Sequence, residues 1–344
     1  MPEQSQSLST EKLVNGVLQA IDREREREII SRRFGLFDRK ETLEQIGELL
    51  GITRERVRQL EKAVIQKLRE AGEKHSLDGI DNFETLVLSH LEKSGQASRI
   101  SDLSLKLIEE PSKIEQSRVA FLCSLCPDLV VISEDDIYYA GVGNKSIYSE
   151  KSIKDGVINI VAIIAKIGEP KKIQEVAKQA NIDDPKQAEA LASISKQLAT
   201  LNGLWGLVKW PLVNPKNIRD KIYVILKENG RHMHFNEIAD AIKNSEFKRK
   251  DVTTQAIHNE LIKDKRFVLI GRGIYALKEW GYEKGTVADI ISQVLREANE
   301  PLHRDEIVKR VLKSRFVKET TILLNLQGKP QFKRVAKATY ELAE

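Results

Sequence analysis

Apolar residues between positions 54 and 69 recur at intervals of three or four. At about 100° per residue they fall on one stripe of a helix, and they are Val57, Leu60, Val64 and Leu68. The opposite face carries polar side chains: Glu55, Gln59, Lys62 and Gln66. The pattern predicts an amphipathic helix with one packed side and one open side.

A shorter helix is predicted directly before this one. The sequence TLEQ at 42–45 is a capping-box pattern, and the expected inner side consists of Leu43, Ile46, Leu49 and Leu50. Gly51 suits a tight turn that needs a left-handed conformation, and Thr53 can cap the following helix. Two short helices joined in this way are typical of a helix-turn-helix that reads DNA. An ordinary helical hairpin with a solvated charged face is the alternative.

The segment RRFGLFDRKETLEQIGELLGITRERVRQLEKAVIQKLR at 32–69 resembles region 4 of the primary bacterial sigma factors. The resemblance covers about residues 23–70, and in that family region 4 binds the promoter −35 element. It implies that Arg54, Glu55 and Gln59 contact bases. It also implies that four residues hold phosphates or border the groove: Thr42, Arg56, Arg58 and Lys62.

Beyond residue 75 the hydrophobic pattern repeats four times with a period of about 67 residues. Each repeat reads as three helices followed by two apolar strands, which is the plan of a winged helix. Aromatic residues mark the four strand pairs at Tyr138, Trp205, Tyr275 and Tyr340. The fold predicted is mainly α with small β wings: an N-terminal helix-turn-helix followed by tandem winged-helix domains.

The expected domains are the helix-turn-helix at 1–75 and winged helices at 79–145, 152–212, 215–283 and 285–344. Glycine, proline or polar joints near 141–152, 211–217 and 281–285 mark three of the boundaries. Residues at about 218–283 resemble the HARE-type winged helix of the delta subunit of bacterial RNA polymerase, through HFNEIADAI and RFVLIGRGIYALKEWGY. Residues 285–344 resemble it less closely.

Composition and charge place the chain among soluble globular proteins. Hydrophobic residues make up 41% and charged residues 31%, and the sequence predicts neither a membrane span nor a secretory signal. Two cysteines offer no disulfide framework, which suits a reducing cytoplasm. The predicted location is the bacterial cytoplasm, in association with the nucleoid. Residues 70–150 carry 7 Lys and Arg against 15 Asp and Glu, whereas residues 215–344 carry 26 against 18. The basic C-terminal part could follow a polyanion, which the acidic segment would repel.

The last two repeats therefore offer candidate DNA contacts. In the third repeat these are Lys248, Arg249, Lys250, Thr253, Thr254 and Arg272. In the fourth they are Arg315, Lys318, Thr320, Lys333 and Arg334. A solvated basic surface or a protein-docking face is an equal alternative. The acidic first repeat, with Glu134, Asp135 and Asp136 in its expected wing, is predicted to contact protein or to be structural.

Catalytic or metal chemistry is not predicted. Cys123 and Cys126 form a single C-x-x-C within an apolar helical pattern, which favours core cysteines over a zinc site. No cofactor is expected, and a metal role for His232 and His234, two positions apart in an expected turn, has no support in the sequence. The chain is predicted not to be an enzyme.

The leading hypothesis is a sequence-specific DNA-binding transcription regulator whose target is double-stranded DNA with a −35-like sequence. Nothing in the sequence resembles sigma region 2, so we expect no complete sigma activity. The competing hypothesis is an accessory factor that docks on the RNA polymerase core through its sigma-like and delta-like parts. An architectural protein that coats DNA is a third alternative, and it predicts little sequence preference.

Overall fold

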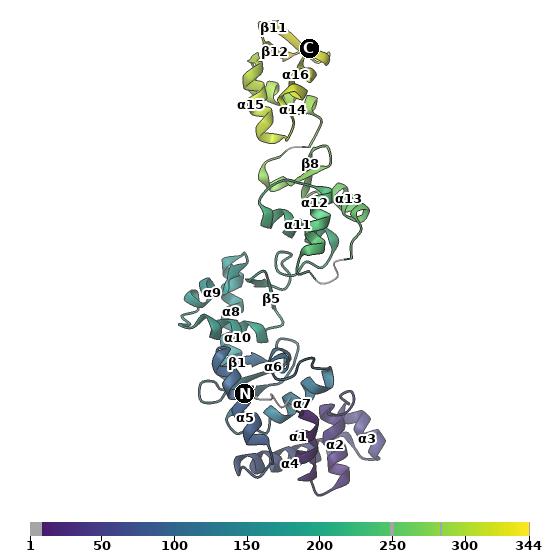
Figure 1. The fold of residues 1–344 in the computed structure, drawn as a ribbon, viewed down its shortest axis with the longest axis vertical. Coiled ribbons are helices and arrows are strands. Elements are labelled where there is room, and N and C mark those ends of the chain that lie inside the picture. Colours follow the sequence, from purple (N-terminus) through teal and green to yellow (C-terminus); the bar gives the residue numbers. More distant parts are fainter. Residues whose placement is uncertain (1–8, 248–250, 283, 344) are drawn as a thin grey trace, which may run out of the picture. The chain divides into compact units, whose positions relative to one another are not determined.

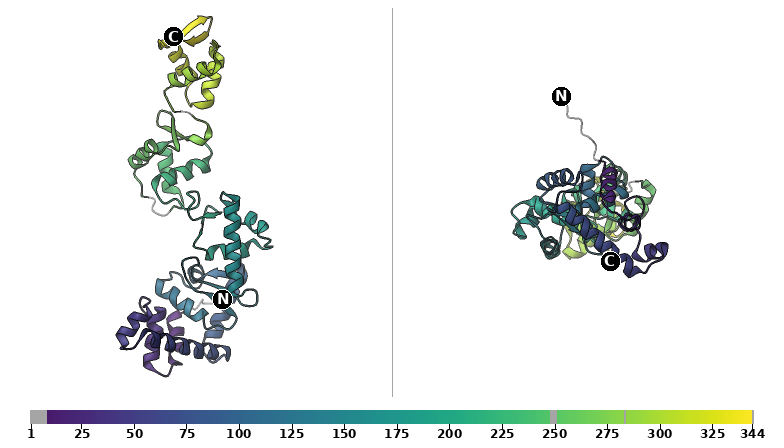
Figure 2. Two further views of the ribbon diagram at one scale, coloured as in Figure 1. Left: turned by 180° about the vertical axis from the view of Figure 1, so that it is seen from behind. Right: turned by 90° about the horizontal axis from the view of Figure 1, so that it is seen from below.

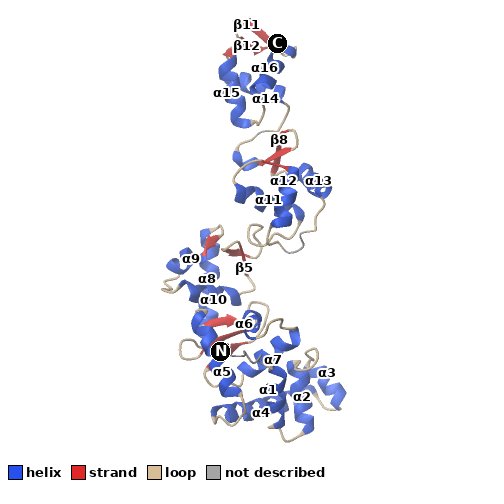
Figure 3. Ribbon diagram, viewed as in Figure 1, coloured by secondary structure: helices blue, strands red, loops and turns tan. Residues whose placement is uncertain are grey.

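The computed structural model describes residues 9–247, 251–282 and 284–343 (Figure 1). The chain forms two compact units, one ending at Lys209 and the other beginning at Trp210. Both are mainly helical with small antiparallel sheets (Figure 3), and Figure 2 shows the same elements from two further sides.

The first unit opens with four helices: α1 (Thr10–Gln19), α2 (Glu24–Phe34), α3 (Leu43–Leu50) and α4 (Arg54–Glu73). The predicted capping box is present, because the Thr42 hydroxyl accepts from the Gln45 N–H and the Gln45 side chain accepts from the Thr42 N–H. Gly51 ends α3 in the left-handed conformation at φ 63°. The Thr53 hydroxyl then caps α4 by accepting from the Arg56 N–H. The two helices and the tight turn are confirmed.

Each of the four repeats has the same order of elements: a long helix, a short strand, two helices and two strands. In the first unit they are α5 (Ile80–Lys93), β1 (Ala97–Arg99), α6 (Ile100–Leu107), α7 (Lys113–Cys123), β2 (Leu129–Ile132) and β3 (Gly141–Asn144), then α8 (Glu150–Ile167), β4 (Lys171–Lys172), α9 (Ile173–Gln179), α10 (Pro185–Ile194), β5 (Leu198–Leu201) and β6 (Leu204–Leu207).

The second unit contains the other two repeats. The third repeat consists of α11 (Ile218–Asn229), β7 (Met233–His234), α12 (Phe235–Asn244), α13 (Thr254–Lys263), β8 (Phe267–Gly271), β9 (Ile274–Leu277) and the 3₁₀ helix η1 (Lys278–Trp280). The fourth consists of α14 (Val287–Ala298), β10 (Leu302–His303), α15 (Arg304–Ser314), α16 (Glu319–Gly328), β11 (Phe332–Ala336) and β12 (Thr339–Leu342).

Every sheet has three strands rather than the two predicted. The short strand before the second helix pairs with the last strand of its repeat, which lies in the centre, and the remaining strand forms an edge. These strands, β1, β4, β7 and β10, are only two or three residues long. Apolar alternation cannot be recognised over so few positions, so the sequence pattern missed them.

The aromatic alignment of the first repeat was wrong. Trp205, Tyr275 and Tyr340 each pair with the short strand of their sheet, but the corresponding position in the first repeat is Val142. Tyr138 instead lies in the β2–β3 loop and forms an isolated bridge to Ser195. The longer loop shifted the strand, so that Gly141–Asn144, expected in a joint, form β3.

One hydrophobic core joins α1, α2 and α4 to the first repeat. It runs from Val14 in α1 to Val142 in β3 and includes Val64 and Leu68 of α4. The ring of Phe34 in α2 lies 5.1 Å from that of Phe121 in α7. The core therefore crosses residues 75–79, where the sequence predicts a domain boundary.

The third helix of each repeat has different surroundings in the two units. In the first repeat α7 packs against α1 and α2, and in the second α10 packs against β1. In the second unit α13 packs on α11 and α12, and α16 packs on α14 and α15. The first two of these helices are thus covered by a preceding part of the chain, whereas α13 and α16 pack mainly within their own repeats.

Three further sequence expectations can be compared with the structure. Leu49, expected on the inner side of α3, is 55% exposed, whereas Ile46 is buried and Leu43 and Leu50 pack against its cluster. Cys123 and Cys126 are buried as predicted, and burial raises the pKa of both thiols. Across the described ranges, no helix is long and apolar enough to cross a membrane.

Candidate nucleic-acid interface

A small hydrophobic cluster fixes α4 against α2 and α3. Ile29, Ile46 and Val57 are fully buried together, one from each helix. The Arg25 guanidinium also donates to the Leu50 carbonyl at the end of α3, where the helix dipole favours a cation. These contacts bury one face of α4 and leave the first two turns of its opposite face open.

The three predicted base-contacting residues lie together on that open face. Arg54, Glu55 and Gln59 are all exposed in the first two turns of α4. An exposed N-terminal half of the second helix is the part that enters the major groove in helix-turn-helix proteins. Glutamate and glutamine offer acceptors and donors that suit base edges.

The four predicted phosphate contacts surround this face. Thr42, Arg56, Arg58 and Lys62 are all exposed. The Thr42 hydroxyl accepts a main-chain hydrogen bond at the start of α3 and keeps its own proton for a second acceptor. The three cations lie in the first three turns of α4.

The Arg58 guanidinium forms a bidentate ion pair with the Glu55 carboxylate. Its Nε and Nη2 donate to the two Glu55 oxygens at 2.8 Å and 2.7 Å. The hydrogen bond from Arg58 is the largest cause of a lowered Glu55 pKa, and the bond to Glu55 likewise raises the pKa of Arg58. Glu55 is therefore held as a carboxylate, an obligate acceptor of hydrogen bonds.

The remaining polar side chains of this face are also linked to one another. Arg56 Nη1 donates to Gln59 Oε1 at 3.3 Å, and Arg54 Nη1 lies 3.6 Å from Glu44 Oε2 of α3. Because these pairs are exposed, their net contribution to stability is small. Breaking them therefore costs little.

The candidate contacts of the last two repeats lie on several elements. Thr253 caps α13, Thr254 begins it, and Arg272 is exposed in the turn between β8 and β9. In the fourth repeat four candidates are exposed: Lys318 just before α16, Thr320 in α16, and Lys333 and Arg334 in β11. Lys248, Arg249 and Lys250 lie outside the described residues.

Arg315 faces its own chain rather than the exposed basic surface. Its Nη1 donates to the Leu269 carbonyl at 3.4 Å, and its Nε is buried without a hydrogen-bond partner in the described structure. Burial lowers the pKa of this guanidinium. The sequence could not show this, because Leu269 lies 46 residues away.

Sequence reasoning also missed the residues that anchor the candidate interface to the first repeat. Arg118 of α7 is buried; its Nε donates to the Leu36 carbonyl at 2.7 Å and its Nη1 lies 3.1 Å from Glu11. Arg69 Nε of α4 donates to the Ser124 carbonyl at 3.1 Å. No local sequence signal predicts either contact, since each joins residues more than fifty positions apart.

The described residues offer no group of three His, Cys, Asp or Glu side chains arranged to hold a metal ion. The His234 side chain accepts the Asn236 N–H at the start of α12, which gives this histidine a structural role. Residues 42–62 are thus the part of the chain where the predicted chemistry comes together.

Comparison with known proteins supports the same segment. Residues 23–70 match the family model for sigma-70, region 4. The RNA polymerase sigma factor SigA1 of Synechococcus elongatus is 47% identical over 57 residues, 16% of this chain and 14% of the relative. The sigma factor RpoD of Helicobacter pylori is 56% identical over 48 residues, 13% of this chain and 7% of the relative.

A longer match is found with the sigma factor SigA of Microcystis aeruginosa, 46% identical over 68 residues, 20% of this chain and 16% of the relative. The chain spans less than a fifth of each of these relatives, so the likeness concerns this segment. Residues 23–70 are thus a sigma-70 region 4 segment, which indicates a DNA-binding role in transcription.

Proposed function

We propose that this chain is a sequence-specific DNA-binding regulator of transcription that reads a −35-like promoter sequence at the bacterial nucleoid. The observation that carries the proposal is the open face of α4, where Arg54, Glu55 and Gln59 are exposed behind the Thr53 cap. The packed side of the helix is fixed by Val57, Val64 and Leu68. The geometry matches the insertion of a recognition helix into the major groove.

In this proposal the cations move on binding. Arg58 leaves Glu55 and turns to a phosphate, so that the Glu55 carboxylate can accept a hydrogen bond from a cytosine amino group. Arg56 likewise releases Gln59, which can then make a bidentate contact to adenine. Thr42 and Lys62 add backbone contacts that set the register of the helix.

The four repeats are proposed to be winged helices within the predicted boundaries 79–145, 152–212, 215–283 and 285–344. Support comes from their shared order of three helices and a three-stranded sheet. The covered helices α7 and α10 suit a structural role for the first two repeats. In the last two repeats the exposed Arg272, Lys318 and Lys333 suit additional DNA contacts.

The family match covers residues 23–70, and the four repeats follow it in the chain. We therefore propose a regulator rather than a complete sigma factor. The test is selection of bound sequences from a randomised duplex pool by the full chain at about 150 mM salt, since non-specific binding falls steeply with salt. The expected result is a −35-like consensus. A bound pool without enriched sequences would contradict base reading by α4.

A second candidate function is docking on the RNA polymerase core. It is favoured by large apolar side chains on the outward faces of two third helices: Ile262 of α13 is 62% exposed and Leu324 of α16 is 68% exposed. Such residues are more typical of protein contacts than of phosphate contacts. A pull-down with purified core polymerase tests it, using the variant I262S/L324S. Docking through these helices predicts capture of the unmodified chain and loss of capture by the variant.

A further inference from the structure

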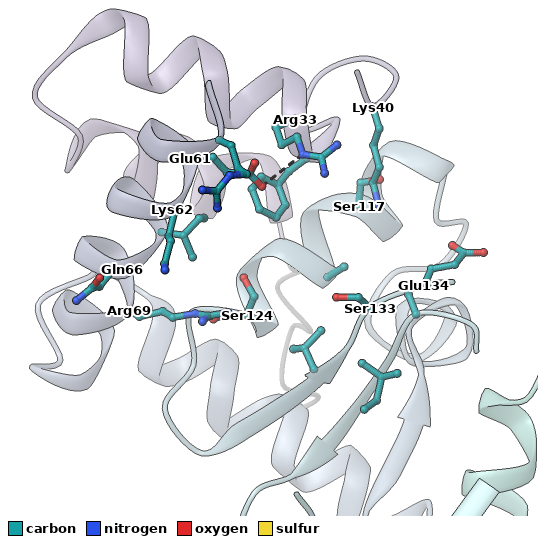
Figure 4. A pocket seen from close by; sticks show the side chains of 17 residues that line it. Arg33, Lys40, Glu61, Lys62, Gln66, Arg69, Ser117, Ser124, Ser133 and Glu134 are labelled. Carbon is teal, nitrogen blue, oxygen red and sulfur yellow. Dashed lines mark hydrogen bonds and ion pairs between the residues drawn. The ribbon is translucent and has the colours of Figure 1, made fainter. Parts of the chain in front are cut away.

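A cleft of about 800 Å³ lies between α4 and the first repeat, beside the contacts that join them (Figure 4). One wall is formed by α4 from Arg58 to Arg69, and the other by α7, β2 and the start of the β2–β3 loop. Apolar side chains lie along the cleft, among them Ile65 of α4 and Val131 of β2. Its surface is therefore mixed: part of it is apolar and part of it is charged.

Positive charge predominates around the cleft. The lining includes five cations, Arg33, Lys40, Arg58, Lys62 and Arg69, but only two carboxylates, Glu61 and Glu134. Arg33 pairs with Glu61 at 3.4 Å. The side-chain ammonium groups of Lys40 and Lys62 form no ion pair or hydrogen bond with any residue that the structure describes. The cleft thus offers unpaired cations to an acidic occupant.

Strand β2 presents an open edge to this cleft. It is the outermost strand of its sheet, paired with β3 alone. The Lys145 N–H donates to the Asp128 carbonyl, and hydrogen-bonded pairs alternate in an antiparallel ladder. Val130 and Ile132 therefore bond to β3, while the N–H and C=O of Val131 point away from it.

The third repeat shows the same edge position in use. The Lys278 N–H donates to the Arg266 carbonyl just before β8, so Leu269 corresponds to Val131. The Leu269 carbonyl accepts from the Arg315 guanidinium, through Nη1 at 3.4 Å. In that repeat, the outward-facing carbonyl of the edge strand is thus reached by a donor from outside the sheet.

We propose that the cleft binds an extended acidic segment of a partner protein, which adds to the edge of β2 as a further strand. The outward N–H and C=O of Val131 would pair with its backbone, and its carboxylates would approach Lys40 and Lys62. A DNA duplex fits less well, because it has no backbone amides to pair with the edge of a strand. Such a segment could come from any protein with alternating acidic and apolar residues.

Two of the cations, Arg58 and Lys62, are also predicted phosphate contacts. The bound segment would therefore compete with DNA, and this consequence alone rests on the proposed function. Peptide binding is measurable without DNA, so failure of the DNA-binding proposal and failure of the peptide proposal can be told apart.

The experiment measures fluorescence anisotropy of a labelled eight-residue peptide of alternating valine and glutamate with the full chain at about 50 mM salt. V131P removes the outward N–H, and proline is tolerated at such an edge position. T200P is the matched control, because Thr200 occupies the same outward position on β5, as the Val208–Gln197 hydrogen bond shows. Thermal melting checks that both variants remain folded.

The expected result is saturable binding of the peptide to the unmodified chain. Its affinity should fall at least ten-fold in V131P and in K40E/K62E and should be unchanged in T200P. The same peptide with lysine in place of glutamate should not bind. Equal binding by V131P and the unmodified chain would overturn the proposal, as would absence of saturable binding. If a DNA duplex bound in a way that depended on Lys40 while the peptide did not bind, the cleft would be assigned to DNA. That result would also overturn the peptide proposal.

Discussion

The backbone of α4 meets the end of α7 where Gly72 packs against the carbonyl oxygen of Leu125. A methyl group on Gly72 would overlap that oxygen, and no flexible side-chain end is available to move away. Glycine is therefore required for the close approach of the two segments, although it lies within a helix that would otherwise favour alanine.

G72A is accordingly expected to destabilise the chain by about 1–3 kcal/mol, the range for overpacking a buried site. The matched control is G16A, because Gly16 is an exposed helical glycine of α1 whose added methyl group would meet nothing within 4 Å. That change should stabilise by about 0.5–1 kcal/mol. Urea unfolding of the full chain measures both, and a neutral G72A would show that the contact is looser than described.

Arg118 should matter more for stability than its surface partner does. R118A leaves the Leu36 carbonyl without its donor, which we expect to cost about 2 kcal/mol. E11A removes only the exposed end of the same interaction and should have a small effect. The midpoints of urea unfolding of R118A, E11A and the unmodified chain, measured in one buffer, test this expectation. Equal losses would mean that the ion pair, rather than the hydrogen bond to Leu36, stabilises this junction.

The pH dependence of stability should include a contribution from Glu84. Its side chain is buried and accepts the Asp128 N–H at 2.6 Å, and burial raises its pKa above the usual value. A raised carboxyl pKa means that the folded state binds the proton more tightly than the unfolded state, so this group destabilises the fold as pH rises through the shifted pKa. E84Q keeps an acceptor without the charge.

E84Q should therefore raise the thermal midpoint at pH 7.5, and the difference from the unmodified chain should shrink below the ordinary glutamate pKa, near pH 4. Melting curves at four or five pH values between these limits are sufficient. An advantage of E84Q that persists unchanged at pH 4 would contradict the assigned cause.

Loss of the Glu55 carboxylate should change which sequences are bound rather than how strongly DNA is held. E55A is expected to reduce discrimination at one base pair by about ten-fold, while affinity for unselected duplex does not fall, since Arg58 is released. Selection from a random pool by both proteins measures this directly. Unchanged sequence preferences at every position would rule out Glu55 as a base contact.

Arg56 should behave in the opposite way. R56A is expected to weaken all duplexes alike and to reduce the slope of log K against log salt by about one unit, as for one lost phosphate contact. K67A serves as control, because Lys67 is exposed on α4 but lies outside the predicted interface. A salt slope that does not change in R56A would remove this residue from the backbone contacts.

The parts of the fold that sequence analysis predicted correctly depend on local interactions. The caps at Thr42 and Thr53 and the left-handed Gly51 involve residues three or four positions apart, so their patterns are legible in the sequence. The packed stripe of α4 was predicted for the same reason, and Val57, Val64 and Leu68 are buried as expected.

The features that were missed depend on distant contacts. Arg118 contacts Leu36, which lies 82 positions away in the sequence, and no periodic pattern predicts such a pair. Val142 replaced Tyr138 in the sheet because the length of the β2–β3 loop, rather than aromatic character, sets the strand register. The cleft beside α4 exists only because α7 and β2 come close to a helix that precedes them by more than forty residues.

The core that runs from Val14 to Val142 also affects where a protease can cleave this part of the chain and whether the sigma-like segment can be moved to another protein. Leu77 and Ile80 are buried at the expected boundary, so the exposed residues 73–76 are followed at once by a segment anchored in this core. Helices α1 to α7 should unfold together, in one cooperative step. Moved into another protein without α7, the sigma-like segment would leave an apolar surface uncovered, so it is not a freely transferable cassette.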